Sequence, residues 1–444
     1  MLKNELRSRL LELGVHPSKM LGQNFLLDTN LAAAIVAAIE PQAGDHIVEI
    51  GPGMGALTRP IVDSPATHIT LIERDHRLAE ELKTRYADTR VRVICEDAAK
   101  IDLREIYGYG PIKVIGNLPY SASTAIIAHF TSAFSPACSL VLMLQREVAE
   151  RLAAIPGHKD YAALTILLSR RWSVKKLRVV PPDVFWPRPN VESTIVKIVP
   201  RPINEVLRCD EKKFRELVRL GFSSRRKQLG SLLKIPVACW TSLAQKLGHP
   251  PTARAEDLTV SDWSHLVQQL YRLKATRATE LFDVVDEHDH VVEPMERTLV
   301  HGKKLRHRAI HIWIFNAKGE LFLQKRSLWK DNYPGLWCSS IAGHVDSGED
   351  YFRAAHREMR EEIGITTTLK PFHRLEASEE TKQEFIECFY GFSEGPFLLD
   401  QYELEAGAFF ASSVIEQWMA LHPENFTPVF KILAKKFLNI PFAC

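Results

Sequence analysis

The first 200 residues alternate short apolar runs with stretches of helical periodicity. Four of the runs have the length and composition of buried strands: His46–Ile50, His68–Ile72, Val91–Cys95 and Ile112–Ile115. A helical stretch over residues 28–39 precedes the first run, and Gly116 is expected to end the last. The pattern predicts an open α/β sheet in residues 1–200.

Acidic or amide residues stand at the ends of all four predicted strands: Glu49, Glu73, Asp97 and Asn117. In an open α/β sheet, ligands bind outside the carboxyl ends of the strands. Any one of these residues fits a solvated strand end equally well. Four in succession favour a convergent crevice, so we expect these side chains to lie together in a binding site.

The first strand runs directly into a glycine-rich loop, Gly51-Pro52-Gly53-Met54-Gly55. Glycines at alternate positions let the backbone approach a ligand closely. The spacing is G-x-G-x-G, whereas dinucleotide enzymes use G-x-G-x-x-G. At the ends of the next two strands, Glu73 is placed to accept hydrogen bonds from two ribose hydroxyls and Asp97 from an adenine amino group.

Asn117-Leu118-Pro119-Tyr120 follows the fourth strand and has the residue types needed to activate a poor nucleophile. The lone pair of an exocyclic adenine amine is delocalised into the ring. An Asn carbonyl and a rigid main-chain carbonyl before Pro119 would accept hydrogen bonds from that amine, and Tyr120 would stack on the base. An ordinary strand-to-loop turn is the alternative, because Asn and Pro are common in turns.

Residues 201–273 change to helical periodicity with interspersed Lys and Arg. Phe214, Leu217, Leu220 and Gly221 recur at helical spacing and predict one buried face. We expect a small helical domain that presents basic residues to RNA, with Arg225, Arg226 and Lys227 as the candidate contacts. A basic, solvated helix face is the alternative.

A short polar stretch, residues 273–280, is the predicted linker to a third region, residues 281–444. Residues 310–315 and 321–325 predict a β-hairpin. Further on, Ser347 with Asp350 three residues later predicts a helix start, and Gly364 predicts its end.

The helix that is predicted to end at Gly364 has an apolar face. We expect this face, formed by Phe352, Ala355, Met359 and Ile363, to point into the core. Glu358, Glu361 and Glu362 fall together on another face. Carboxylates about 4 Å apart repel by about 4 kcal/mol near a protein surface, so a hard divalent cation such as Mg²⁺ or Mn²⁺ is the expected occupant. Balance by neighbouring arginines alone is the competing explanation.

Composition and charge narrow the possible number of domains, the class of partner and the cellular compartment. The 444 residues are too many for one typical core, and 45% hydrophobic with 25% charged residues is ordinary for a globular protein. Residues 1–280 carry 39 Lys and Arg against 29 Asp and Glu, and residues 281–444 carry 18 against 25. The basic first part favours a polyanionic partner. Seven scattered cysteines without a C-x-x-C pair, no apolar run of membrane-spanning length and no signal peptide predict a cytoplasmic protein without a membrane partner.

Six motifs in the first 270 residues together resemble the rRNA adenine dimethyltransferases. They are Gln23-Asn24-Phe25-Leu26, Glu49-Ile50-Gly51-Pro52-Gly53, Asn117-Leu118-Pro119-Tyr120, residues 144–151, residues 184–193 and Phe222-Ser223-Ser224-Arg225-Arg226-Lys227. The resemblance is greatest to the small-subunit enzymes that dimethylate two adjacent adenines in a hairpin loop. It implies a Rossmann-like methyltransferase domain that uses S-adenosylmethionine, with small-subunit rRNA or the pre-ribosomal small subunit as partner.

The resemblance also implies roles for individual residues. The expected contacts to S-adenosylmethionine are Asn24, Leu26, Glu49, Gly51, Gly53, Glu73, Asp97 and Asn117. The groups expected around the target base are Asn117, Pro119 and Tyr120, with Phe185 as the opposite stacking face. Ser224 and Glu96 depart from the residues that the family often has at these positions.

The stretch from Gly343 to Ile365 resembles the box of the Nudix hydrolases, an α+β family. Gly343 is followed by Glu349 and then by Arg357-Glu358-Met359-Arg360-Glu361-Glu362-Ile363-Gly364-Ile365. The resemblance implies hydrolysis of a pyrophosphate bond in a nucleoside-diphosphate-like small molecule. Glu358, Glu361, Glu362 and the Gly343 carbonyl would hold Mg²⁺ or Mn²⁺, and Arg357 and Glu349 would support them.

The surroundings also resemble isopentenyl diphosphate isomerase, a relative in fold, through residues 313–319 and 334–337. His344, with His301 and His307, is near the positions of the isomerase's metal-binding histidines. Ala342 replaces the catalytic cysteine of that enzyme, which favours hydrolysis over isomerisation.

Three alternatives stay open for the whole chain. The first part could methylate large-subunit rRNA, as resistance enzymes of the same superfamily do. It could also be an RNA-binding assembly factor with a vestigial methyl site. The second part could be a Nudix-shaped scaffold without catalysis.

Overall fold

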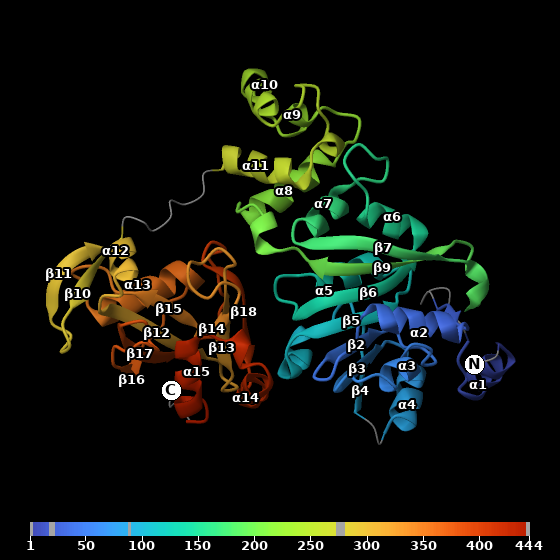
Figure 1. Cartoon of the computed structure of the whole chain (residues 1–444), viewed down its shortest axis with the longest axis horizontal. Helices are drawn as coiled ribbons and strands as arrows, with labels where there is room; N and C mark the ends of the chain where they lie inside the picture. The colour runs from blue at the N-terminus through green and yellow to red at the C-terminus, as the bar shows by residue number, and fades with distance from the viewer. Residues whose placement is uncertain (1–2, 17–22, 88–89, 272–279, 441–444) are drawn as a thin grey trace. The chain divides into compact units, whose positions relative to one another are not determined.

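The computed structural model describes residues 3–16, 23–87, 90–271 and 280–440. The chain forms two compact units, residues 1–271 and residues 272–444 (Figure 1). Within the described ranges, no helix combines the length and the apolar character required to cross a bilayer.

The first unit is built on a seven-stranded sheet. Its order is β4 (Val91–Cys95), β3 (His68–Glu73), β2 (His46–Ile50), β5 (Ile112–Asn117), β6 (Ala137–Gln145), β9 (Ser193–Pro200) and β7 (Trp172–Val180). The first five are parallel, and β9 runs antiparallel to both neighbours. The strand order reverses between β2 and β5, and this is where open α/β sheets bind ligands.

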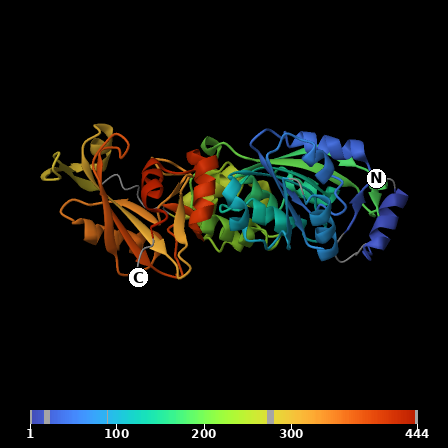
Figure 2. The same ribbon diagram turned by 90° about the horizontal axis from the view of Figure 1, so that it is seen from below.

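Helices lie on both sides of this sheet, as two perpendicular views show (Figures 1 and 2). They are α2 (Thr29–Ala38), α3 (Thr58–Val62), α4 (His76–Arg85), α5 (Ser123–Phe130), α6 (Arg146–Leu152) and α7 (Ala163–Ser169), with α1 (Lys3–Glu12) at the N-terminal end. A two-stranded pair, β1 (Phe25–Leu26) and β8 (Phe185–Trp186), joins segments far apart in sequence. The predicted α/β architecture of this part of the chain is confirmed.

The predicted strands match the observed ones except at two ends. Strand β3 continues one residue beyond the predicted end at Ile72, to Glu73. The fourth strand was expected to stop at Gly116, but β5 continues to Asn117. Gly116 sits where a Cβ atom would lie 2.6 Å from the main-chain oxygen of Ile50 in β2. Glycine therefore allows close packing inside the sheet here, instead of breaking the strand.

Four helices follow the sheet: α8 (Glu211–Gly221), α9 (Leu229–Leu232), α10 (Val237–Lys246) and α11 (Val260–Leu270). Phe214 and Trp263 are fully buried in their shared core, which also takes in Ile166 of α7. The predicted buried face is correct for Phe214 and Leu217, but Leu220 is 43% exposed. Because the helices share a core with α7, residues 1–271 form one compact unit.

The second unit also has a seven-stranded sheet. Its main order is β14 (Trp337–Cys338), β13 (Leu321–Arg326), β12 (His307–Phe315), β17 (Glu384–Phe392) and β16 (Lys370–Leu375), while β15 (Ile341–His344) pairs with β12 and β18 (Leu404–Phe410) pairs with β13. A separate hairpin, β10 (Leu281–Val285) and β11 (Val291–Glu296), leads into α12 (Arg297–Gly302). The remaining helices are α13 (Tyr351–Ile363), α14 (Ser412–Leu421) and α15 (Pro428–Phe437).

Helix α13 departs from its prediction in two ways. Its N-cap is Asp350, whose carboxylate accepts from the Arg353 amide at 2.8 Å, whereas the Ser347 hydroxyl donates to Asp283. Phe352, expected in the core, is 49% exposed. Ala355, Met359 and Ile363 are buried as expected, and Gly364 ends the helix in the left-handed conformation.

Candidate functional site

A cavity of about 1000 Å³ opens at the carboxyl ends of the parallel strands of the first unit. Six residues expected to bind a cofactor line it: Asn24, Leu26, Glu49, Gly51, Gly53 and Glu73. Asp97, Asn117 and Pro119 line it as well. The structure therefore brings nine predicted site residues, from loops and strand ends spread over 96 positions of sequence, around one space.

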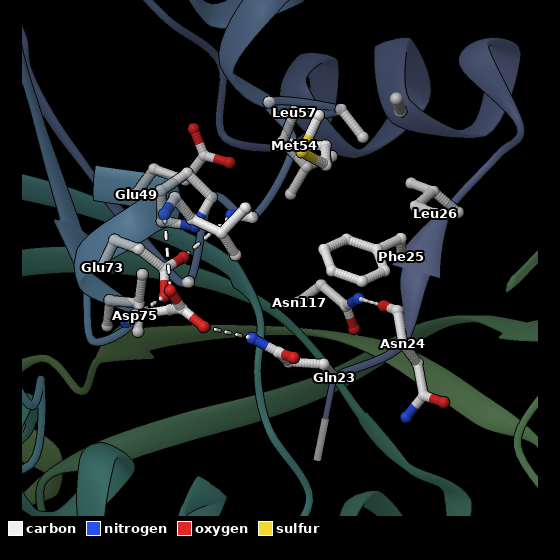
Figure 3. A pocket seen from close by; sticks show the side chains of 18 of the residues that line it. Gln23, Asn24, Phe25, Leu26, Glu49, Met54, Leu57, Glu73, Asp75 and Asn117 are labelled. Carbon is white, nitrogen blue, oxygen red and sulfur yellow. Dashed lines mark hydrogen bonds between the residues drawn. The ribbon is translucent and has the colours of Figure 1, made fainter. Parts of the chain in front are cut away.

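Glu73 is fixed at the end of β3 by two main-chain amides. Its carboxylate oxygens accept from Gly53 N at 3.0 Å and from Asp75 N at 2.9 Å (Figure 3). Burial raises the pKa of Glu73, while these two hydrogen bonds oppose the shift. Each oxygen keeps a further lone pair, so the carboxylate can accept from a ligand in a fixed orientation.

Positive φ angles account for the first two glycines of the glycine loop. Gly51 and Gly53 have φ angles of +64° and +58°, in the region that side chains with a Cβ seldom adopt. A Cβ at Gly53 would lie 3.1 Å from the Phe25 ring, and one at Gly51 would lie 3.7 Å from Asn117 O. The loop therefore forms a cradle next to the end of β5.

The amide of Asn117 is oriented by the main chain just before β1. Asn117 Nδ2 donates to the carbonyl oxygen of Asn24 at 2.8 Å (Figure 3). Because the nitrogen is engaged there, the side-chain oxygen Oδ1 is the group available to accept from a ligand. The contribution of Asn24 seen here comes from its backbone, not from its side chain.

Two other predicted cofactor residues have protein partners. Glu49 is buried and accepts from the Thr58 hydroxyl at 2.7 Å, and burial raises its pKa to about 8. Asp97 accepts from Ala99 N at 3.0 Å and lies 3.6 Å from Arg74 Nη1. Asp97 keeps a partly exposed carboxylate at the cavity, whereas that of Glu49 is directed at α3.

Tyr120 and Phe185 do not line the cavity described here. The Tyr120 and Ser193 hydroxyls are hydrogen-bonded at 2.8 Å. Phe185 is 3% exposed, because the pairing of β8 with β1 at Leu26 carries its ring into the main core. The ring of Phe185 is therefore not accessible to a base in this arrangement. Its stacking on the target base stays a prediction.

The three basic candidates of the helical region lie in the turn between α8 and α9. Arg225, Arg226 and Lys227 are all exposed. Arg225 also forms an ion pair with Glu256 at 2.7 Å, so it is partly neutralised. Their exposure is compatible with RNA contacts.

In the second unit, the three carboxylates of α13, which were predicted to share one face, differ in burial. Glu358 and Glu362 are 1% exposed, while the Glu361 side chain is 52% exposed. A Cβ at Gly343 would lie 2.4 Å from the carboxyl carbon of Glu358. Gly343 and Glu358 are therefore in direct contact.

Arg357 pairs with two of these carboxylates, those of Glu358 and Glu361. Its guanidinium donates to Glu358 at 2.7 Å, to Glu349 at 2.9 Å and to the His344 carbonyl at 3.0 Å, and it lies 3.5 Å from Glu361. Charge-assisted hydrogen bonds of this kind are what make buried carboxylates tolerable. Their oxygen-only donor set suits a hard cation.

Comparison with known proteins gives the first unit its family. The family model for ribosomal RNA adenine dimethylase matches residues 16–282, more than half of the chain. A relative from Chromobacterium violaceum, named ribosomal RNA small subunit methyltransferase A, is 37% identical over 255 residues, 57% of this chain and 96% of the relative. The chain belongs to the ribosomal RNA adenine dimethylase family. Its first unit is a methyltransferase unit of the Rossmann-like, S-adenosylmethionine-dependent class.

Other comparisons extend the result to the second unit. A NUDIX domain model matches residues 305–430, so this is a Nudix unit.

A second relative of the methyltransferase unit, from Thiobacillus denitrificans and of the same name, is 39% identical over 255 residues, 57% of this chain and 98% of the relative. A solved dimethyladenosine transferase from Plasmodium falciparum is 25% identical, covers 55% of this chain and 97% of its own, and has a TM-score of 0.48.

The Nudix unit has a second cluster of possible metal ligands. Ligand atoms of His301, His307 and His344, from α12, β12 and β15, lie within 4.8 Å of one another. Glu384 Oε1 in β17 lies 3.3 Å from His344 Nε2 and 3.6 Å from His307 Nε2. Burial lowers the pKa of His344 to about 3 and that of His301 to about 4, which keeps both rings neutral.

The histidines were flagged in the sequence, but Glu384 was not. It stands in an apolar strand 40 residues after His344, and no spacing rule connects them. His307 Nδ1 is engaged with the Leu305 carbonyl at 2.9 Å, which leaves Nε2 directed to the cluster. A cavity of about 80 Å³ adjoins the cluster and is lined by His344, Glu384 and four cationic side chains, those of Arg297, Arg326, Lys330 and Lys382, among others.

Proposed function

We propose that the methyltransferase unit dimethylates two adjacent adenines of small-subunit rRNA, and that the Nudix unit hydrolyses a pyrophosphate bond of a nucleoside-diphosphate-type small molecule. The names of the relatives support the first activity. The proposed partner is the rRNA itself or the pre-ribosomal small subunit, and such a substrate would place the enzyme in the cytoplasm.

The observation that carries the methyltransferase proposal is the orientation of Asn117. Its Nδ2 is held by the Asn24 carbonyl, so Oδ1 can accept from an adenine amine at the cavity. The main-chain carbonyl before Pro119 is the second proposed acceptor. Two acceptors localise the amine lone pair and stabilise the positive charge that develops on nitrogen.

The residues around the cavity fit S-adenosylmethionine. The Gly51–Gly53 cradle admits a ligand against the backbone, Glu73 presents a fixed carboxylate for ribose hydroxyls, and Asp97 presents one for the adenine amino group. When bound, the sulfonium of this cofactor supplies an electrophilic methyl group, so no metal is needed. Asn24, Leu26, Glu49 and Asn117 complete the proposed set, and Tyr120 and Phe185 are proposed to contact the target base.

Mapping methylated adenines tests the proposal and separates it from its two rivals. The full chain would be incubated with S-adenosylmethionine and with unmethylated small and large ribosomal subunits, followed by primer extension on both rRNAs. Paired stops in a small-subunit hairpin loop are expected. Stops confined to large-subunit rRNA would indicate the resistance-type activity, and no S-adenosylmethionine binding by calorimetry would indicate an assembly factor.

For the Nudix unit, the carboxylate box fits a hard divalent ion, with Mg²⁺ or Mn²⁺ proposed. Glu358, Glu361, Glu362 and the Gly343 carbonyl are the proposed ligands, because oxygen donors meet there and Arg357 already holds two of the carboxylates. Such an ion would neutralise phosphate charge. Arg357 and Glu349 are proposed as supporting residues.

The histidine cluster fits a softer transition metal such as Zn²⁺, because imidazole nitrogens suit Zn²⁺ better than Mg²⁺. Its position beside a cavity with Arg326 and Lys382 suits a phosphorylated ligand. Ala342 provides no proton donor for an isomerase, and hydrolysis stays the proposed reaction.

A screen of phosphorylated compounds with the full chain and Mg²⁺ tests the Nudix proposal. Release of orthophosphate or a nucleotide from one class of diphosphate is the expected result. No release from any class, with rRNA methylation intact as evidence of folded protein, would favour the scaffold without catalysis.

We also propose a functional division of the chain at residues 1–200, 201–273 and 281–444. The helical region would contact RNA through Arg225, Arg226 and Lys227, whose exposure supports this assignment. The predicted linker, residues 273–280, falls almost wholly outside the described residues.

A further inference from the structure

The Nudix box is tied to a strand that lies outside the matched Nudix region. The family match begins at residue 305, and β10 covers Leu281–Val285. β10 forms an isolated bridge between Phe282 and Asp346, and Ser347 N donates to the Leu281 carbonyl at 2.8 Å. The loop that leads from β15 to α13 is therefore held from outside the domain core.

Asp283 makes the strongest of these attachments. This residue is 8% exposed, and both carboxylate oxygens are engaged by the loop: Oδ1 accepts from the Ser347 hydroxyl at 2.6 Å, and Oδ2 from Gly348 N at 2.9 Å. Gly348 has a φ of +77°, so the loop turns sharply at the residue that Asp283 holds. A buried carboxylate with two donors fixes the position of both.

The loop continues without a break into the box. Glu349 follows Gly348, and its carboxylate accepts from Arg357 at 2.9 Å. Arg357 in turn donates to Glu358 at 2.7 Å and to the His344 carbonyl at 3.0 Å. A continuous path of hydrogen bonds and adjacent residues thus connects Asp283 to the carboxylate that lies against Gly343.

We infer that Asp283 is a positioning residue of the Nudix box, which sets the placement of Glu349 and Arg357 and, through them, the geometry of Glu358. The inference rests on the proposed metal-binding role of the box. It makes residues 281–304 a working part of the Nudix site, although they precede the matched domain. Stacking of Phe282 on the ring of His344, with centroids 4.7 Å apart, adds a second contact from β10 to the residue after Gly343.

The test measures Mn²⁺ binding to the full chain. The electron paramagnetic resonance signal of free Mn²⁺ reports how much of the ion is unbound. Binding that is lost in the Glu358→Gln, Glu362→Gln double variant is assigned to the box. Binding that remains in this variant is assigned to other sites, such as the histidine cluster. Asp283→Ala is expected to weaken the box site about tenfold, because it removes a buried, charge-assisted acceptor from the loop. Ser347→Ala, which removes one of the two donors, is expected to weaken it about threefold.

Three further comparisons make the result specific. Adding Ser347→Ala to Asp283→Ala should weaken binding no further, because Asp283→Ala has already removed the acceptor of the Ser347 hydroxyl. Asp283→Asn, which keeps the shape and one acceptor, should fall between Asp283→Ala and the unaltered chain. Glu293→Ala, an exposed carboxylate on the same hairpin, should bind like the unaltered chain, and rRNA methylation should be equal in all variants.

The possible outcomes separate the two proposals. A box site of unchanged affinity in Asp283→Ala would overturn the positioning role and leave the proposed Nudix function standing. Equal weakening in Glu293→Ala would also overturn it, because the effect would belong to the hairpin as a whole. No box-dependent Mn²⁺ in the unaltered chain would overturn the proposed function together with this inference.

Discussion

The two units of this chain build their sites in opposite ways. In the methyltransferase unit, polar groups from strand ends and a glycine loop surround a cavity of about 1000 Å³, and main-chain groups hold them in place. In the Nudix unit, two carboxylates of one helix are 1% exposed, and an arginine side chain binds one of them, that of Glu358. The first site is shaped by the backbone and the second by ion pairs.

The difference predicts which changes each site tolerates. A site held by amides depends on strand register and glycine conformation, and changes little when a distant side chain is replaced. A site held by ion pairs depends on the balance of buried charges. Removing one partner leaves the other charges buried without compensation, which is destabilising. The following predictions test this contrast, beginning with the largest effect.

The Glu358→Gln, Glu362→Gln double variant should reduce diphosphate hydrolysis by about a thousandfold or more, because the buried oxygens proposed to hold the cation lose their charge. Methylation of rRNA by the same protein should not change. Steady-state rates of both reactions in one preparation check this. Hydrolysis that survives the double substitution would show that the box is not responsible.

Glu73→Gln should weaken S-adenosylmethionine binding by about tenfold to a hundredfold, since an amide accepts from only one of the two main-chain donors. Isothermal titration calorimetry measures the affinity. Glu105→Gln, an exposed carboxylate in the same unit, is the matched control and should bind normally. Equal affinity of the Glu73 variant and the control would remove Glu73 from the cofactor site.

Sequence patterns predicted the strands that frame the methyltransferase cavity, because apolar runs are local signals. Apolar runs predicted β2 and β4 with the bounds they have, and the polar residue at each strand end marks the cavity edge. The predicted end of β5 was wrong. Glycine is needed at position 116 because the Ile50 main chain, 66 residues earlier in the sequence, packs against it. The contact of Asn117 with the Asn24 carbonyl is equally non-local.

The Nudix helix shows where periodicity fails. The apolar pattern put Phe352 inside, and it treated Glu358 and Glu362 as members of a separate carboxylate face, yet the two carboxylates are buried beside Met359. Glu358 is paired with Arg357, and a hydrophobic pattern does not represent such an ion pair. The predicted cap failed in the same way, because Asp283, 64 residues earlier, binds the Ser347 hydroxyl.

Replacing Arg225, Arg226 and Lys227 together by Ala should weaken rRNA binding several-fold, and should reduce the slope of log affinity against log salt by about 0.7 to 0.9 for each phosphate that is no longer neutralised. Arg225 should contribute least, because Glu256 already pairs with it. Filter binding at several salt concentrations measures both quantities. Lys303→Ala with Lys304→Ala in the Nudix unit serves as the control, and an equal effect there would contradict a specific RNA surface.

Glu49→Gln should stabilise the unliganded protein by a margin that grows with pH. Burial raises the pKa of Glu49 to about 8 in the folded chain, so above its ordinary value of 4.5 the folded state retains a proton that the unfolded state releases. The stability of the unaltered chain therefore falls between about pH 4.5 and 8, and the glutamine variant avoids this decrease. Melting temperatures at pH 5, 6.5 and 8 check the trend, and a constant difference would contradict it.

We propose that the fixed amide of Asn117 activates the target amine in a unit that works independently of the Nudix box. Asn117→Ala in the full chain, measured by single-turnover methyl transfer to small-subunit rRNA, tests it most directly. The rate should fall by about a hundredfold or more, S-adenosylmethionine affinity should fall by a smaller factor, and Mn²⁺ binding at the box should not change. Methyl transfer at the normal rate would contradict the account.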